Sequence, residues 1–280
     1  MGAAKNNPTT VTTFGGGRFS PDQIQAWEAD RCAAFAVAIE RLRGWPLHAT
    51  FIGDEVVRLQ AEDASDRAYD PRGIFTTARF GDAVVVPLAH ARRDWPHSAF
   101  QDNHLRIGTK CVGEEGLAEL GIAVDETRVQ DAITRIEANT LYLDLVPTRP
   151  HPRLPATALS RYSWSGCVVY AEALSRILGL PAMTMTAVQV APGHDLSGEQ
   201  IHAIVQHTDG TVEDVWGRQS AEAVARRYAM VRWALDAQAH RDMIEEAFRI
   251  RPGATDDVAR AEALIRQHRE GGPSSTGMAT

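Results

Sequence analysis

The sequence predicts an α+β protein made of two related units, because one pattern of residues occurs twice. Residues 32–46 and 167–181 have Cys, Ala, Ala, Arg, Gly and Pro at matching offsets, and their apolar residues recur with the period of a helix. Each Gly-x-Pro ending is followed by a strand-forming segment, 48–51 in the first copy and 183–190 in the second. We therefore expect each unit to contain a Cys-bearing helix packed on an antiparallel sheet.

The match between the copies resumes downstream of the two helices. Arg58 precedes Asp70 by twelve positions in the first copy, and His202 precedes Asp214 by twelve positions in the second. A glycine stands three positions after each aspartate. The second copy thus offers Cys, His and Asp, whereas the first offers Cys, Arg and Asp.

Length and composition suit a soluble globular protein of two domains: 280 residues, 44% of them apolar and 23% charged. The net charge is −7, and no basic stretch offsets it, so we expect no nucleic-acid partner. The short basic pairs Arg92-Arg93 and Arg226-Arg227 are interpreted as solvated faces or helix ends.

Targeting signals are not expected in this chain. It has no run of eighteen apolar residues, so no membrane partner is predicted. The N-terminal residues lack the apolar core of a secretory signal. The three cysteines are spread along the chain and do not make a disulfide framework. These features favour a cytoplasmic location.

Changes in composition predict the domain boundaries. A Gly/Thr-rich flexible arm over 1–19 precedes the first unit, 20–146. The Pro-rich stretch 147–155 is the best candidate for a linker. The second unit is expected over 156–270, followed by a disordered tail over 271–280.

The first helix has clear start and stop signals. Ser20 can cap it, Pro21 suits its first turn, and Gln23 completes a capping box. This helix is predicted to run through Cys32 to Arg43 and to end at a left-handed glycine. The other predicted elements are strands at 83–88, 140–146, 201–205 and 212–216, and helices at 129–138, 220–237, 241–249 and 255–269.

Cys167 is the best nucleophile candidate because it is expected at a helix N-terminus, where the dipole lowers the pKa of a thiol. Ser163 or Ser165 could cap this helix. The Cys167 N–H could point to a developing oxyanion, and Tyr162 or Trp164 could supply a second donor.

His202 and Asp214 are expected on neighbouring strands of one hairpin. Asp209-Gly210 is a strong turn signal between them. A base and its orienting carboxylate on adjacent strands can become close neighbours. The sequence therefore predicts a Cys–His–Asp arrangement in which imidazole activates sulfur and the carboxylate fixes the imidazole tautomer.

The order Cys167, Gly179-Leu-Pro181, His202-Ala203, Asp209-Gly210 and Asp214 resembles the core of transglutaminase-like proteins in the papain-like cysteine hydrolase superfamily. The resemblance implies Cys167 as nucleophile, His202 as base and Asp214 as orienting residue. It also implies a thioester intermediate formed from an amide of a protein or peptide-like substrate, with no cofactor.

Several outcomes of this chemistry stay open. A peptidase (thiol protease), a deamidase and a transglutaminase-like acyltransferase would all use it. The long insertion at 189–200 and the duplication depart from the pattern and leave the substrate undefined. The alternative is a non-catalytic binding or assembly protein built on a decayed hydrolase fold. The oligomeric state is also open.

The first unit is expected to lack this chemistry, with Cys32, Arg58 and Asp70 as degenerate counterparts. A guanidinium stays protonated near neutral pH and cannot act as a base. A second alignment places Asp54-Glu55 opposite the histidine, and a carboxylate there would disfavour thiolate. His48 is a spare candidate base away from the matched position. This copy could serve packing, substrate recognition or partner binding.

A metal site is the main chemical rival. His194, His202, His207 and Asp209 are clustered in the sequence and could include zinc ligands. However, neither His-Glu-x-x-His nor Cys-x-x-Cys occurs, so no metal is expected. Cys111 has no recognisable partner in the sequence and is interpreted as structural.

Overall fold

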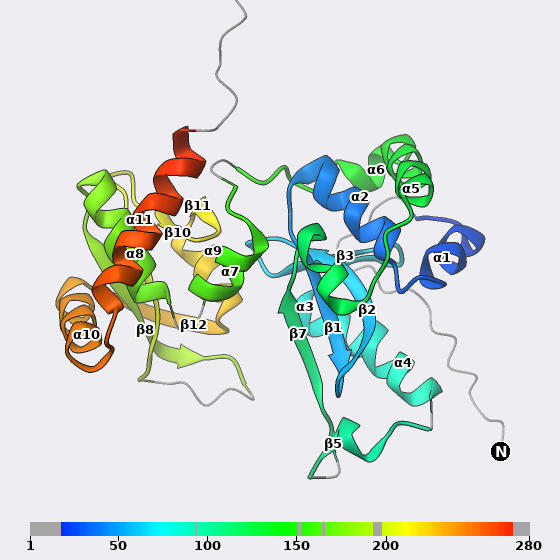
Figure 1. Cartoon of the computed structure of the whole chain (residues 1–280), viewed down its shortest axis with the longest axis horizontal. Coiled ribbons are helices and arrows are strands. Elements are labelled where there is room, and N and C mark those ends of the chain that lie inside the picture. The colour runs from blue at the N-terminus through cyan, green and yellow to red at the C-terminus, as the bar shows by residue number, and fades with distance from the viewer. Residues whose placement is uncertain are drawn as a thin grey trace, which may run out of the picture. The chain divides into compact units, whose positions relative to one another are not determined.

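The protein is a mixed α+β structure with antiparallel sheets (Figure 1). The computed structural model describes residues 18–92, 94–102, 104–150, 153–163, 166–192 and 198–270, apart from the side chains of Ser98 and Glu270. The chain forms two compact units, of which the first ends at Thr148 and the second begins at Arg149. This division lies within the stretch 147–155.

The first unit contains six α-helices and seven strands among its described residues. The helices are α1 Pro21–Glu28, α2 Ala33–Arg43, α3 Thr77–Phe80, α4 Val86–Ala91, α5 Glu126–Ala138 and α6 Thr140–Leu143. A π-helix, Gly81–Val85, joins α3 to α4, and short 3₁₀ turns occupy His97–Ala99, Glu114–Gly116 and Ala118–Leu120. The strands are β1 Leu47–Ile52, β2 Glu55–Glu62, β3 Arg67–Asp70, β4 Gly73–Thr76, β5 Phe100–Gln101, β6 His104–Leu105 and β7 Ile107–Cys111.

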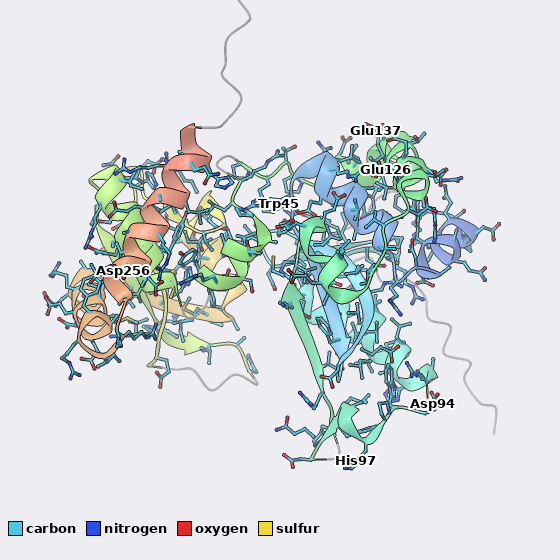
Figure 2. The ribbon with its side chains drawn as sticks, in the orientation of Figure 1. Trp45, Asp94, His97, Glu126, Glu137 and Asp256 are labelled. Atoms are coloured by element: carbon cyan, nitrogen blue, oxygen red, sulfur yellow. The ribbon has the colours of Figure 1, made fainter. Side chains whose placement is uncertain are left out.

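The main sheet of this unit has the order β4-β3-β2-β1-β7, and β5 and β6 form a separate hairpin. Helix α2 packs on the sheet with α5 beside it (Figure 1). Every residue from Ala33 to Ile39 is buried, because the core surrounds the N-terminal part of α2. Glu126, which begins α5 and is labelled in Figure 2, bonds Arg41 of α2 at 2.6 Å.

The second unit contains five helices and five strands among its described residues. The helices are α7 Ala156–Tyr162, α8 Cys167–Leu178, α9 Ala221–Arg227, α10 Ala237–Ile250 and α11 Ala254–Glu270. The strands are β8 Ala182–Val190, β9 Gln200–Gln206, β10 Val212–Asp214, β11 Gly217–Gln219 and β12 Met230–Asp236. They form one sheet of order β11-β10-β9-β8-β12, and α8 packs against α11 (Figure 1).

The two main sheets have the same strand order and the same register around the matched residues. Thr50 pairs with Arg58 in the first sheet, and Met185 pairs with His202 in the second. Thr50 and Met185 each follow the cysteine of their unit by eighteen positions. The aspartate of each copy pairs with the glycine three positions later. The matched spacing in the sequence therefore corresponds to matched positions in two sheets.

The single helix predicted across Cys32 is wrong, because the chain breaks between α1 and α2. Arg31 and Cys32 have φ of 59° and 65°, in the left-handed region that a right-handed helix cannot include. The carbonyl of Arg31 accepts a hydrogen bond from the Leu59 N–H at 2.8 Å, which ties the break to β2. The capping box at Ser20 and the left-handed Gly44 are confirmed.

The strand predicted at 83–88 is wrong, because this segment is helical. A short run of valines without alternation fits a buried helix as well as a buried strand. Val84 and Val85 pack against Phe75 and Phe80 in an apolar cluster. Pro87 lies in the first turn of α4, where its missing N–H is not needed.

The strand predicted at 140–146 is also wrong, since the segment begins with α6. The Asn139 side chain accepts a hydrogen bond from the Tyr142 N–H and caps this short helix. Tyr142 is buried and donates its hydroxyl to the Asp70 carbonyl oxygen at 3.1 Å. Tertiary packing of this ring thus overrides the strand-like character of the segment.

The helix predicted at 220–237 is only partly present. Ser220 caps α9 through a bond from the Ala223 N–H at 3.2 Å, but the helix ends at Arg227. Ala229 then adopts a left-handed φ of 55° and turns the chain into β12. This strand pairs with β8 and completes one edge of the sheet.

The arm expected over 1–19 does not extend to Phe19, which is buried in the first unit. Its ring lies 5.0 Å from the rings of Trp27 and Tyr142 and 5.6 Å from that of Phe35. The rest of the expected arm up to residue 17, and the expected tail from 271, lie outside the described residues.

Candidate active site

Cys167 is the first residue of α8, and Gly166 is the residue before the helix. A side chain at Gly166 would not fit, since a Cβ there would lie 2.7 Å from the Arg161 carbonyl oxygen. Among the described residues no side chain caps α8, so Ser163 does not have the capping role expected of it. The Ser163 hydroxyl instead accepts a bond from Trp216 Nε1 at 3.1 Å. Ser165 lies outside the described residues.

His202 and Asp214 form the buried pair that the strand pattern predicts. His202 is on β9 and Asp214 ends β10, and both are 2% exposed. The Nε2 atom of His202 lies 3.0 Å from Oδ2 of Asp214. A carboxylate at this nitrogen fixes the ring tautomer and leaves Nδ1 for a proton transfer.

The remaining nitrogen of His202 is the one left for the Cys167 thiol. Nδ1 is buried and, within the part of the chain that the structure describes, makes no hydrogen bond of conventional geometry. The Cys167 and His202 side chains nevertheless interact, and each changes the pKa of the other.

The charges of this pair favour a thiolate beside an imidazolium. Burial raises the pKa of Cys167, but the hydrogen bond and charge of His202, together with the N–H groups of Ala203 and Val168, bring it below its usual value. Burial lowers the pKa of His202, but the Asp214 carboxylate and the Cys167 sulfur bring it above its usual value. The site is therefore electrostatically prepared for a sulfur nucleophile.

Asp214 is held ionised by several donors besides the histidine. Arg227 Nη1 lies 3.1 Å from Oδ2, while the Trp216 N–H and Gln219 Nε2 donate to Oδ1 at 2.8 and 3.1 Å. Burial raises the pKa of Asp214, but Arg227 and then His202 bring it below its usual value. Both arginines are at the end of α9, as expected, but Arg227 turns to Asp214 and is part of the site, whereas Arg226 is exposed.

Tyr228 covers the imidazole and was not found by sequence reasoning. Its ring stacks on that of His202, with centroids 4.4 Å apart and planes 28° apart. Its hydroxyl donates to the Ser163 carbonyl oxygen at 2.5 Å. The tyrosine therefore links the base to the segment before Cys167. Its sequence signal was hidden because residues 220–237 resemble one continuous helix.

Of the two candidate oxyanion donors, Tyr162 lies within the described residues and Trp164 does not. Tyr162 packs its ring on Tyr170, with centroids 5.4 Å apart. Burial raises the pKa of the Tyr162 phenol, whose charged neighbours are Arg161 and the α11 residues Asp257 and Arg260. The Tyr162 ring also lies against Gly166, the residue before Cys167, and its role as an oxyanion donor stays a prediction. Trp164 lies outside the described residues.

The first unit holds its matched residues in a different arrangement. Arg58 Nε and Nη2 lie 2.8 and 2.9 Å from the two carboxylate oxygens of Asp70, and both side chains are buried. Glu28 also contacts the guanidinium, at 3.0 Å. The strand register thus puts Arg58 at the place that His202 has in the second sheet. Asp54 does not occupy that place, because it lies in the turn before β2.

The environment of Cys32 disfavours the thiolate form that a nucleophile needs. Cys32 is fully buried, and burial raises its pKa well above the usual value despite the nearby Arg58. It precedes α2 with left-handed backbone, whereas Cys167 lies inside the first turn of α8. The Leu59 N–H donates to the Arg31 carbonyl, while the Ala203 N–H at the matched place interacts with the Cys167 sulfur.

The histidine cluster considered for a metal is divided among separate ion pairs. His207 Nε2 lies 2.9 Å from Glu213 Oε2, and Asp209 bonds Arg218 and Thr211. Across the described ranges, no group of three or more potential ligands could hold a metal ion. His194 lies outside those ranges.

Comparisons with family models, with curated proteins and with solved structures found no match to this chain. Among the helices in the described ranges, none combines the length and the apolar character needed to cross a membrane.

Proposed function

We propose that the second unit is a papain-like, transglutaminase-like cysteine hydrolase or acyltransferase that acts on an amide through a thioester. The observation that carries this proposal is the linked set of side chains: Asp214 binds Nε2 of His202, and His202 in turn lowers the pKa of the Cys167 thiol. The shared strand order of the two sheets supports a duplicated unit of this kind.

The proposed reaction uses these three side chains in two steps. The Cys167 sulfur attacks the amide carbonyl carbon, and His202 transfers its Nδ1 proton to the leaving amine as the C–N bond breaks. Water or an acceptor amine then attacks the thioester, gives its proton to His202 and releases Cys167. Asp214 stabilises the imidazolium throughout and holds the ring in place. Hydrolysis and acyl transfer differ only in the second nucleophile.

Alkylation of Cys167 by iodoacetamide, followed site by site by mass spectrometry, tests the prepared thiol. We expect its rate to rise with pH around a midpoint below the free-thiol pKa of about 8.5. His202→Ala should move this midpoint above that value and slow the reaction at neutral pH, because the buried thiolate loses its cation. The neighbouring strand-end variant His207→Ala is the matched control and should leave the rate unchanged.

The opposite result would support the binding or assembly alternative. A Cys167 midpoint at the free-thiol value in the native protein, with no response to His202→Ala, is incompatible with the proposed nucleophile. The rate is compared with that of Cys167 in the urea-unfolded chain, because that reference does not depend on the reactivity of another cysteine.

A further inference from the structure

A second thiol and imidazole lie side by side in the first unit, away from the Arg58–Asp70 pair. Cys111 ends β7 and His48 is on β1, and the two residues are directly opposite in this antiparallel pair. The Val112 N–H donates to the Leu47 carbonyl at 2.9 Å, which makes that pair the hydrogen-bonded one. The adjacent pair, His48 and Cys111, is therefore of the non-hydrogen-bonded type, in which side chains lie closest.

The carboxylate of Glu62, on the neighbouring strand β2, lies near His48, so Cys111, His48 and Glu62 form a row across three strands. His48 Nε2 lies 3.7 Å from Oε2 of Glu62 on β2. His48 Nδ1 lies 3.4 Å from the Pro46 carbonyl oxygen, so both ring nitrogens have an acceptor oxygen nearby. Glu62 is thus placed to balance a positive charge on the His48 ring.

The thiol of this row is accessible while its base is enclosed. Cys111 is half-buried, whereas His48 is 7% exposed. This differs from Cys32, which is completely buried. A small reagent can therefore reach Cys111, and a charge on the neighbouring imidazole is little screened by water.

The second unit has nothing equivalent at these places. By the offsets that match the two copies, His48 corresponds to Met183 and Glu62 to Gln206. The pairing of β12 with β8 ends at Asp236 and Thr184, and the next residue, Ala237, begins α10, so β12 supplies no counterpart of Cys111. The row is thus particular to the first unit and is no remnant of the matched Cys–His–Asp pattern.

We propose that Cys111 is a second reactive thiol of this chain, activated by His48 and Glu62, which exchanges with low-molecular-weight disulfides. The His48 ring takes the thiol proton, and the sulfur attacks one sulfur of the disulfide. A mixed disulfide with Cys111 forms, the original S–S bond breaks, and a thiolate leaves. This step needs no other oxidant and does not depend on the proposed hydrolase chemistry.

Exposure of the full chain to glutathione disulfide at neutral pH tests this proposal, with peptide mapping to locate each adduct. We expect Cys111 to form the mixed disulfide about tenfold faster than the same cysteine in the urea-unfolded chain, since a larger thiolate fraction outweighs its lower intrinsic nucleophilicity. His48→Gln, which keeps a donor toward Pro46, should remove most of this gain, and Glu62→Gln should remove part of it.

Two controls keep the outcomes separate. His104→Gln changes an exposed histidine of the same unit and should leave the Cys111 rate unchanged. His202→Ala should also leave it unchanged, so failure at Cys111 and failure at Cys167 are independent results. Circular dichroism checks that each variant is folded. Equal rates for native and unfolded Cys111, or equal rates for His48→Gln and His104→Gln, would overturn the proposal.

Discussion

Asp70 and Asp214 occupy matched places in the two sheets, yet different cations neutralise them. Asp214 is balanced by an imidazole and by Arg227, whereas Asp70 is bound by the single guanidinium of Arg58 from two sides. At the offset of Arg227, thirteen positions after the aspartate, the first unit has an alanine. An arginine in place of the histidine thus removes the base and also makes the second cation unnecessary.

The buried ion pair of the first unit predicts a large effect on stability. Arg58→Ala should lower the free energy of unfolding by about 3–5 kcal/mol, because it leaves the Asp70 carboxylate buried without its main partner. The double variant Arg58→Met, Asp70→Leu should recover most of that loss, since no unpaired charge remains. Urea denaturation measures both values. Similar losses in the single and double variants would contradict this account.

At this scale the sequence predicts the pair His202 and Asp214 well, because a short hairpin with an Asp-Gly turn leaves little freedom in register. It does not predict Arg227 and Tyr228, whose roles depend on where α9 ends. Nor does it reveal the neighbours His48 and Cys111. They are 63 positions apart and meet only because β7 adds to the edge of the sheet.

Some helix ends are determined by a local sequence signal, and others are determined by tertiary packing. The glycines that follow α2 and α8 both adopt left-handed backbone, as the Gly-x-Pro pattern predicts. The break before Cys32 has no comparable signal, because non-glycine residues take the left-handed conformation there. Apolar runs such as 83–88 fail for another reason: their burial is compatible with either a helix or a strand.

Two glycine substitutions separate backbone conformation from packing. Gly179→Ala should destabilise the protein by about 1 kcal/mol, because φ is +66° although nothing lies within 4 Å of the added Cβ. Gly81→Ala has equal space but a helical φ of −52°, so it should stabilise by about 0.5–1 kcal/mol. Thermal denaturation compares the two variants. Shifts of the same sign would show that φ does not control these sites.

At the scale of the whole molecule, each unit has its own sheet and its own apolar cluster. The two-unit α+β organisation follows from the repeated pattern in the sequence. The sequence cannot supply the positions of β7 and β12, because these edge strands come from segments with little strand pattern, and their place depends on the exposed edges of β1 and β8.

A fragment of the second unit tests this organisation. Residues 149–280 should fold alone, since the cluster of α9 with β8 and β9 and the packing of α11 on α8 lie entirely within the unit. We expect cooperative urea unfolding and the same pH midpoint for Cys167 alkylation as in the full chain. If the fragment lacks a cooperative transition, or if its Cys167 alkylates with the pH midpoint of the unfolded chain, the second unit needs the first in order to fold.

The buried pair of Arg58 and Asp70 has a consequence for how the chain responds to alkali. Burial opposes the charge of Arg58, but its acidic neighbours hold its pKa above the usual value, so this cation persists at every pH a cell experiences. His202 differs, because its raised pKa adds stability below the unfolded value of about 6.5, and that contribution disappears as pH rises through the folded value. The ion pair of the first unit thus keeps both charges across this pH range, whereas the stability that the charged form of His202 adds to the second unit is lost as pH rises.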